Sequence, residues 1–361
     1  MRRITNAPLK YVQGAGAIGH LKEYTDIVGT TGVYALIDGF ILDHYEKQIK
    51  KSYAPHKTPF HMLRFSGECT AEEIDRVIKK ATQTDCDVIL GIGGGKTLDT
   101  AKAAASEMKR SCVIVPTSAA TDAPCSSICA VYNDKGIFQH YVYAVKSPDI
   151  VIADTGIIAA APIRLLIAGM GDAVSTYYET RACAASRAEA ASGGVPSLSA
   201  VSLGAACRDN LFAEGYKALL AAQSKTLNTA LDNIIETNLY LSGIASESGG
   251  LAAAHAIAEA LTVLTELKNM LHGELAAFST LVQLVLEDAL DEEIFFLLDF
   301  LRTVGLPTSL ASMGIKSLSQ ERLMQVALAS CSPQTSMKNM PFKVNPEEVV
   351  SAILVADKLG S

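Results

Sequence analysis

The sequence predicts an α/β domain followed by an all-helical domain, and three observations support this. In the first part of the chain, short apolar runs that suit buried strands alternate with helical segments, which is typical of a parallel sheet covered on both faces. One of these runs ends in three consecutive glycines. After about residue 160, alanine and leucine recur at helical spacing with little strand signal. We therefore divide the chain into residues 1–160 and residues 161–361.

The composition limits the classes of function. The chain has 361 residues, enough for two domains, and a net charge of −7. It contains no basic block, so nucleic acid is not an expected partner. We find neither an opening apolar run typical of a signal peptide nor an apolar stretch long enough to span a bilayer. We therefore expect a cytoplasmic protein that does not associate with a membrane.

The eight cysteines are scattered, and none forms a C-x-x-C pair. In a cytosolic chain this pattern favours free, buried thiols. Cys125 and Cys129 are four residues apart, so a structural zinc site is the alternative. No histidine lies nearby in the sequence to complete such a site.

The α/β part contains several recognisable elements. The expected strands are 10–12, 33–37, 88–92, 112–116 and 151–154, with a linking strand after a helix over 41–51. Further helices are expected from residue 18 and over 71–84. Thr70 and Glu73 have the spacing of a capping box that would open helix 71–84. Residues 131–136 suit a hairpin turn.

The glycine-rich stretch carries the strongest functional signal in this part. The strand 88–92 is followed by Gly93, Gly94 and Gly95, and Lys96 opens an alanine-rich helix. A strand, a glycine turn and a helix N-terminus together form an anion site, so we expect a phosphate or pyrophosphate there. The spacing matches neither the Walker A pattern nor G-x-G-x-x-G. A tight strand–helix turn without a ligand is the alternative explanation.

Other polar residues should lie at the same edge of the sheet. Asp38 follows the strand 33–37 and could accept hydrogen bonds from ribose hydroxyls, although an Asp-Gly pair also suits a simple turn. Ligands of parallel sheets bind outside the carboxyl ends of the strands, so Asp38, the glycine turn and Thr117 should converge. The cleft between the two domains is the expected position of the site.

Three residues of the helical part suggest a metal site. Asp172 is flanked by glycine and alanine, and His255 and His272 lie in apolar surroundings. Histidines are costly to bury without partners. They could be hydrogen-bonded core residues. Alternatively, one carboxylate and two imidazoles make a three-ligand divalent site with a position left for substrate.

Several stretches together resemble a known family. They are Gly67-Glu-Cys-Thr-Ala-Glu-Glu-Ile-Asp-Arg76, Gly91-Ile-Gly-Gly-Gly-Lys-Thr-Leu-Asp-Thr-Ala-Lys102, Thr121-Asp-Ala-Pro-Cys-Ser126, Glu247-Ser-Gly-Gly-Leu-Ala-Ala-Ala-His255 and His272-Gly-Glu274. The chain resembles, nearly end to end, the glycerol dehydrogenases of the iron-containing (type III) alcohol dehydrogenase superfamily. The resemblance implies a Rossmann-like domain and an all-α domain, a dehydroquinate synthase-like fold. It also implies NAD between the domains, zinc with iron as the alternative, a small polyol substrate, and a homo-oligomer, often an octamer.

The resemblance also implies roles for individual residues. Asp172, His255 and His272 match the metal ligands, and Asp122 matches the aspartate that contacts glycerol, our expected catalytic residue. The nucleotide contacts match Asp38, Gly94, Gly95, Lys96, Thr117, Ser126, Ile128 and Tyr132. Thr176 stands where other alcohol dehydrogenases carry a fourth protein ligand. The charge of Asp38 favours NAD over NADP, because it should repel a 2′-phosphate.

The chain departs from the family pattern beside the first metal histidine. A family histidine is Ala258, Asn-Gly is Glu259-Ala260, and a family serine is Ala120. We expect an NAD-dependent, metal-assisted oxidation of glycerol or a similar vicinal diol.

Two alternatives stay open. The first is another reaction on the same scaffold, with a different small diol, a hydroxy acid or a phosphorylated polyol. A phosphorylated substrate should need additional Lys or Arg in the helical part, where Lys268 and Arg181 are the nearest in sequence. The second is a nucleotide-binding protein that has lost catalysis.

Overall fold

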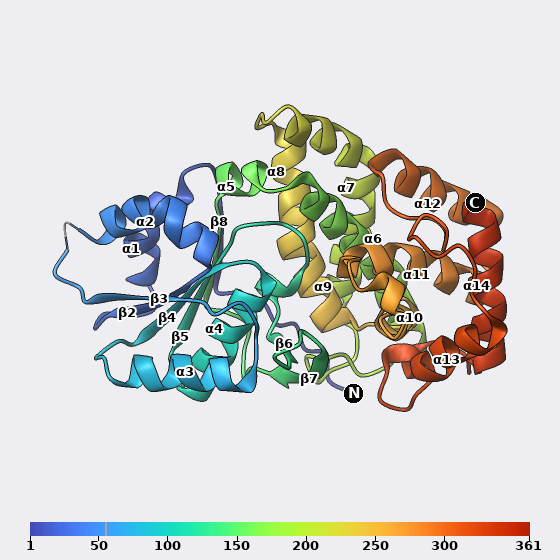
Figure 1. The fold of residues 1–361 in the computed structure, drawn as a ribbon, viewed down its shortest axis with the longest axis horizontal. Helices are drawn as coiled ribbons and strands as arrows, with labels where there is room; N and C mark the ends of the chain where they lie inside the picture. The colour runs from blue at the N-terminus through green and yellow to red at the C-terminus, as the bar shows by residue number, and fades with distance from the viewer. Residues whose placement is uncertain (55) are drawn as a thin grey trace. The chain divides into compact units, whose positions relative to one another are not determined.

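The structure, a computed structural model, describes residues 1–54 and 56–361 and forms two compact units (Figure 1). The α/β unit comprises Asn6–Ala161 and Lys225–Leu227. The helical unit comprises Met1–Thr5, Pro162–Ser224 and Asn228–Ser361. The predicted fold class, a parallel α/β region followed by helices, is confirmed.

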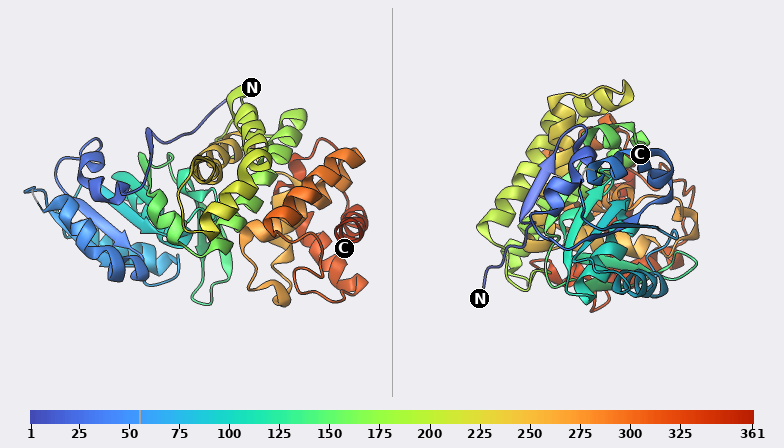
Figure 2. Two further views of the ribbon diagram at one scale, coloured as in Figure 1. Left: turned by 90° about the horizontal axis from the view of Figure 1, so that it is seen from above. Right: turned by 90° about the vertical axis from the view of Figure 1, so that its left-hand side faces the viewer.

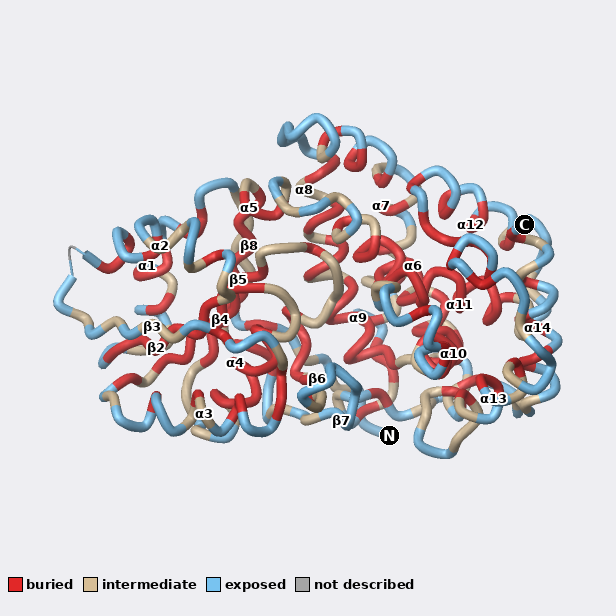
Figure 3. The backbone as a smooth tube through the Cα atoms, in the orientation of Figure 1, coloured by how far each residue is buried: buried red, intermediate tan, exposed pale blue. Residues whose placement is uncertain are grey.

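The α/β unit is built on a six-stranded parallel sheet in the order β1-β8-β5-β4-β2-β3. The strands are β1 (Lys10–Gln13), β2 (Val33–Ile37), β3 (Phe60–Arg64), β4 (Val88–Gly93), β5 (Ser111–Pro116) and β8 (Ile150–Ala153). Every residue of β2, β4 and β8 is buried. Helices cover both faces of the sheet, which explains why these strands are continuous apolar runs rather than alternating ones (Figures 2 and 3).

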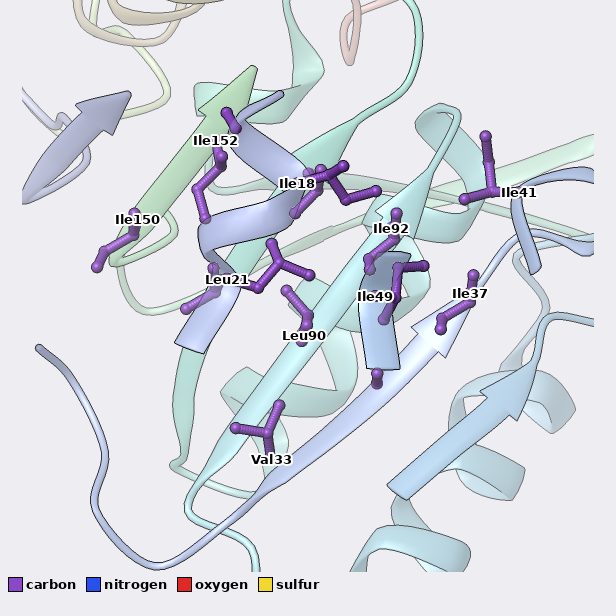
Figure 4. Packing of buried hydrophobic residues seen from close by; sticks show 14 of the residues in the cluster. Ile18, Leu21, Val33, Ile37, Ile41, Ile49, Leu90, Ile92, Ile150 and Ile152 are labelled. Carbon is purple, nitrogen blue, oxygen red and sulfur yellow. The ribbon is translucent and has the colours of Figure 1, made fainter. Parts of the chain in front are cut away.

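One face of the sheet packs against η1 (Ala17–His20), α1 (Leu21–Thr25) and α2 (Gly39–Tyr53). Figure 4 shows this apolar core, in which Ile18, Leu21, Ile41 and Ile49 lie against strand residues. The strand residues are Val33, Ile37, Leu90, Ile92, Ile150 and Ile152.

The other face packs against α4 (Gly95–Glu107), with α3 (Ala71–Thr82) beside it. A Cβ on Gly91 would lie 2.7 Å from the Cβ of Ala101, so α4 rests directly on β4. The unit ends with α5 (Thr155–Ala160), which Asp154 caps through hydrogen bonds from Gly156 N–H and Ile157 N–H.

The predicted capping box at the start of α3 is only half correct. Thr70 Oγ1 accepts the Glu73 N–H at 3.1 Å, as expected. The Glu73 carboxylate instead accepts the Ser66 N–H and binds the guanidinium of Arg76. Burial alone would raise the pKa of Glu73, but these hydrogen bonds outweigh it and lower the pKa. Glu73 therefore joins α3 to the loop before it instead of closing the cap.

The predicted hairpin is confirmed. β6 (Ile128–Tyr132) and β7 (Phe138–Tyr143) form an antiparallel pair. Asn133 Oδ1 accepts the N–H groups of Lys135 and Ile137 in the turn. Gly136 has a φ of +72°, which glycine adopts without strain.

The helical unit contains the remaining elements. They are α6 (Ile163–Ser186), α7 (Leu198–Gln223), α8 (Thr229–Glu236), the π-helix η3 (Thr237–Leu241), α9 (Ser242–Gly249), α10 (Ala253–Leu261), η4 (Thr265–Leu267), α11 (His272–Leu286), α12 (Asp291–Val304), α13 (Gln320–Ser330), η5 (Ser336–Asn339) and α14 (Pro346–Gly360). Helix α6 packs against α7, α9 and α11.

Two further expectations concern thiols and membranes. All eight cysteines are free, and all except the partly exposed Cys331 are buried. Within residues 1–54 and 56–361, no helix combines the length and apolar character needed to cross a membrane.

Candidate functional site

The three predicted metal ligands come together in the helical unit. Asp172 lies on α6, His255 on α10 and His272 at the start of α11. Asp172 Oδ1 is 3.6 Å from His255 Nε2 and 3.4 Å from His272 Nε2, and the ligand atoms of all three residues lie within 4.8 Å of one another. Asp172 and His255 are buried, whereas the His272 side chain is 39% exposed. The cluster is therefore exposed on its His272 side, and its oxygen and nitrogen donors suit zinc or iron.

Two glycines allow α6 and α11 to come close enough to form the cluster. Gly171 precedes Asp172, and Gly273 follows His272. A Cβ on Gly273 would lie 1.8 Å from the carbonyl oxygen of Ala168, and a Cβ on Gly171 would lie 2.3 Å from the carbonyl oxygen of Gly273. Any larger residue would force the two helices apart. The glycines therefore set the distance between Asp172 and His272.

Glu179, which the sequence analysis missed, holds His255 from the other side. Its Oε2 lies 2.6 Å from His255 Nδ1, and its Oε1 accepts the N–H groups of Ala252 and His255. The residue is completely buried. A carboxylate on Nδ1 orients the imidazole and leaves Nε2 for a metal. The available signal was a glutamate two helical turns after Asp172, which places the two carboxylates on the same face of α6.

The pKa values within the cluster reflect these contacts. Burial would lower the pKa of His255, but the carboxylates of Glu179 and Asp172 outweigh it and raise the pKa. Burial would raise the pKa of Asp172, but His272 and His255 outweigh it and lower the pKa. The pKa of His272 is raised, because the carboxylate of Asp172 outweighs burial. A cation therefore suits the position between these groups, whether it is a proton or a metal.

An ion pair secures the turn that presents His272. Arg164 of α6 binds both oxygens of the Glu274 carboxylate, at 2.6 and 2.7 Å, and donates to the carbonyl oxygen of Asn269. Glu274 also accepts the Leu271 N–H. The start of α11 is thus tied to α6 on both sides of His272.

The structure also describes the positions at which this chain differs from the family pattern, and two further residues considered in the sequence analysis. Ala258 is fully buried on α10, and Glu259 beside it is partly exposed. Thr176 Oγ1 lies 2.8 Å from Ser242 Oγ, so its hydroxyl contacts α9. Arg181, considered above for a phosphorylated substrate, donates to Glu287 and Glu293 at 2.6 Å each.

In the α/β unit, the predicted convergence of strand ends is observed. The Asp38 N–H after β2 donates to the carbonyl oxygen of Ile92 in β4, and the Thr117 N–H after β5 donates to that of Gly93. A Cβ on Gly93 would lie 2.9 Å from Asp38 Cβ, so glycine is required there. The carboxyl ends of β2, β4 and β5 thus form one edge.

The glycine turn at this edge is open. A Cβ on Gly94 or Gly95 would meet no atom within 4 Å. Gly94 is the N-cap of α4, and no side chain caps the helix there. A phosphate fits such a position, because the first N–H groups of the helix point at it.

Lys96 and Asp38 have additional partners. Lys96 Nζ pairs with Glu68 Oε1, and it lies 5.0 Å from the centre of the Tyr132 ring. Asp38 Oδ1 accepts the N–H groups of Phe40 and Ile41, which makes Asp38 the N-cap of α2. The cap accounts for one oxygen of Asp38, so the ribose contact stays a prediction.

The other predicted residues lie on the segment from Asp122 to Tyr132. Asp122 precedes the short helix η2 (Ala123–Cys125), Ser126 is buried, and Ile128 and Tyr132 are the first and last residues of β6. Lys102 and Asp99, two buried residues of α4 that the sequence analysis did not select, contact this segment.

Comparison with known proteins decides the family. The family model described as iron-containing alcohol dehydrogenase matches residues 8–155. Glycerol dehydrogenase of Citrobacter freundii is 44% identical over 360 residues, covering 100% of this chain and 98% of that protein. The chain belongs to the iron-containing alcohol dehydrogenase family. A solved structure of glycerol dehydrogenase from Schizosaccharomyces pombe matches with a TM-score of 0.96 and 36% identity, covering 99% of this chain and 91% of that one. Glycolaldehyde reductase of Halobacterium salinarum is 36% identical and covers 100% of this chain and 98% of that protein.

Proposed function

We propose that this protein catalyses the NAD-dependent, metal-assisted oxidation of glycerol or a similar vicinal diol to the hydroxyketone. The observation that carries the proposal is the cluster of Asp172, His255 and His272, in a chain that aligns over its whole length with glycerol dehydrogenases. The reaction removes a hydride from the carbinol carbon and a proton from its oxygen, and NAD is the proposed hydride acceptor.

We assign the metal to the three residues of the cluster, with zinc preferred over iron. A bound divalent metal supplies a Lewis acid that lowers the pKa of a substrate hydroxyl. Glu179 keeps the Nε2 atom of His255 directed at Asp172, and the Gly171–Gly273 contact holds His272 in reach. Asp122 is the proposed carboxylate that accepts a hydrogen bond from a substrate hydroxyl and assists its deprotonation.

We assign NAD to the α/β unit and the metal and substrate to the helical unit. The open space over Gly94 and Gly95 supports a pyrophosphate contact there. Lys96 supplies a positive charge at the same turn. The remaining proposed contacts are Asp38, Thr117, Ser126, Ile128 and Tyr132.

A phosphorylated substrate is not favoured. Arg181, one of the two basic residues considered for it, is already paired with two glutamates. A homo-oligomer, an octamer by family resemblance, and a cytoplasmic location complete the proposal. Light scattering of the purified protein measures the oligomeric state.

The decisive experiment is NADH formation from glycerol after chelation, with and without added Zn²⁺. We expect zinc-dependent NADH. Propane-1,2-diol, glycolaldehyde in the reverse direction, a small hydroxy acid and glycerol phosphate should be tested beside it, since the change at Ala258 and Glu259 leaves the substrate ranking open.

The His255→Ala variant should lose turnover and zinc while it retains NAD binding. His20→Ala, a change at an exposed histidine of the α/β unit, is the matched control. Retained turnover in His255→Ala would show that a metal bound by His255 is not needed for the reaction.

A further inference from the structure

Lys102 is a charged residue buried inside the α/β unit. Its side chain is only 1% exposed, and that of its neighbour Asp99 is 8% exposed. Both residues lie on α4, three positions apart and on one face of the helix. An unpaired charge at such a position would be strongly destabilising, so the partners of Lys102 define its role.

The Lys102 ammonium donates hydrogen bonds to three backbone carbonyl oxygens of one segment. Nζ donates to the carbonyl oxygens of Ala123 at 2.8 Å, Ser126 at 3.1 Å and Ile128 at 2.7 Å. These three bonds use all the donors of an ammonium group. The segment leads from η2 into β6, and the Lys102 ammonium binds three of its carbonyl groups, of which that of Ala123 also accepts the Ser126 N–H.

Asp99 completes the arrangement. Its Oδ1 lies 2.9 Å from Lys102 Nζ, and its Oδ2 accepts the Ala130 N–H of β6 at 3.0 Å. Burial would lower the pKa of Lys102, but the carboxylate of Asp99 outweighs it and raises the pKa, so the ammonium stays charged. The pair thus holds four backbone groups between residues 123 and 130.

The same helix begins at the glycine turn. Gly95 is its first residue, and Lys102 lies about two turns later. One rigid element therefore carries the proposed phosphate site at its N-terminus and the anchor for the segment 122–132 on its side. That segment contains Asp122, Ser126, Ile128 and Tyr132.

We propose that Lys102 and Asp99 are positioning residues that hold the segment 122–132 in register with the glycine turn, and so set the affinity for a dinucleotide. Neither residue is assigned a contact with NAD or substrate. The proposal rests on the proposed function for its ligand, but the backbone restraint itself is independent of that function.

The test uses the double variant Asp99→Asn/Lys102→Met. It removes both charges together and keeps similar side-chain volumes, so no unpaired buried charge is left. Lys79→Met, at an exposed position of α3, is the control. The chain contains no tryptophan, so NAD binding is best measured by calorimetry on the full-length protein.

We expect two changes and one property that stays the same. Amide hydrogens of residues 123–130 should exchange faster in the double variant, by about tenfold. Local opening of the segment would then no longer have to break the hydrogen bonds to Lys102 and Asp99. The Kd for NAD should rise roughly 10–100-fold, by analogy with the loss of a residue that orients a metal ligand. Zinc content should be unchanged, because the metal residues belong to the helical unit.

A lowered Tm with unchanged exchange and an unchanged Kd would overturn the proposal, since it would show a merely structural role. If the double variant does not fold, Asp99→Asn/Lys102→Gln serves as the second variant. It also removes both charges, its amide groups retain part of the hydrogen bonding to the segment, and it should raise the Kd by a smaller factor; no rise would again overturn the proposal. Absence of NAD binding in the wild type would refute the proposed function. The amide exchange rates would still show whether Lys102 and Asp99 restrain the segment.

Discussion

Replacing Gly273 with alanine tests whether the contact between α6 and α11 sets the metal geometry. The new Cβ would lie 1.8 Å from the carbonyl oxygen of Ala168 and 2.9 Å from the backbone nitrogen of Asp172. Side-chain Cβ atoms essentially never come within 3.0 Å of another heavy atom. The two helices would therefore have to separate by about 1.2 Å or more at this point, because both clashes are with backbone.

This displacement is large for a metal site, where ligand distances are set to within about 0.2 Å. His272 precedes Gly273, and its Nε2 is 3.4 Å from Asp172 Oδ1. We expect zinc affinity to fall about 100-fold, which corresponds to about 2.8 kcal/mol. Overpacking should lower the free energy of unfolding by about 1–3 kcal/mol.

The assay is competition between the protein and a chelator of known zinc affinity, together with urea unfolding of the metal-free protein. Gly360→Ala is the matched control. Its Cβ would lie 1.7 Å from the carbonyl oxygen of Thr308, an equally severe backbone clash, but at the end of α14. It should lose stability and keep zinc affinity.

Wild-type zinc affinity in folded Gly273→Ala would refute this reasoning, because the helices would then have another way to bring the ligands together. An equal loss of affinity in Gly360→Ala would show that general destabilisation is the cause.

Three further predictions concern carboxylates. Glu179→Gln removes the anionic partner of His255 and should weaken zinc binding roughly 10–100-fold in the same competition assay; unchanged affinity would exclude a positioning role. Glu68→Gln releases Lys96 from its partly exposed ion pair and should tighten NAD binding about two- to fivefold, measured by calorimetry at low salt; weaker binding would show that the pair itself serves the cofactor. The lowered pKa of Glu73 means that its carboxylate adds stability above its ordinary pKa of 4.5, and that this stability is lost as the pH falls through the folded-state pKa. Urea unfolding between pH 6 and pH 3 should therefore show a smaller loss for Glu73→Gln than for the wild type, and equal losses would contradict the assignment.

Much of the α/β unit could be predicted from local pattern. Strands such as β2 and β4 are buried on both faces, so their apolar runs stand out in the sequence. The glycine turn after β4 was recognisable because its conformation depends on neighbouring residues. The same local reasoning failed for Glu73. Its carboxylate binds the Arg76 guanidinium and accepts the Ser66 N–H, instead of accepting the backbone N–H of the N-cap residue as a capping box requires.

The sequence by itself determined the order of the elements, the position of the glycine turn and which residue types could bind a metal. Only the tertiary structure decided that Asp172, His255 and His272 meet, because they lie on three different helices, two of which, α6 and α11, come close through Gly171 and Gly273. It also revealed the partners that no spacing predicts, such as Glu179 behind His255, 76 residues away in the chain. Local propensity acts over a few residues, whereas the burial of a charge is resolved by whichever group the fold brings within hydrogen-bonding distance.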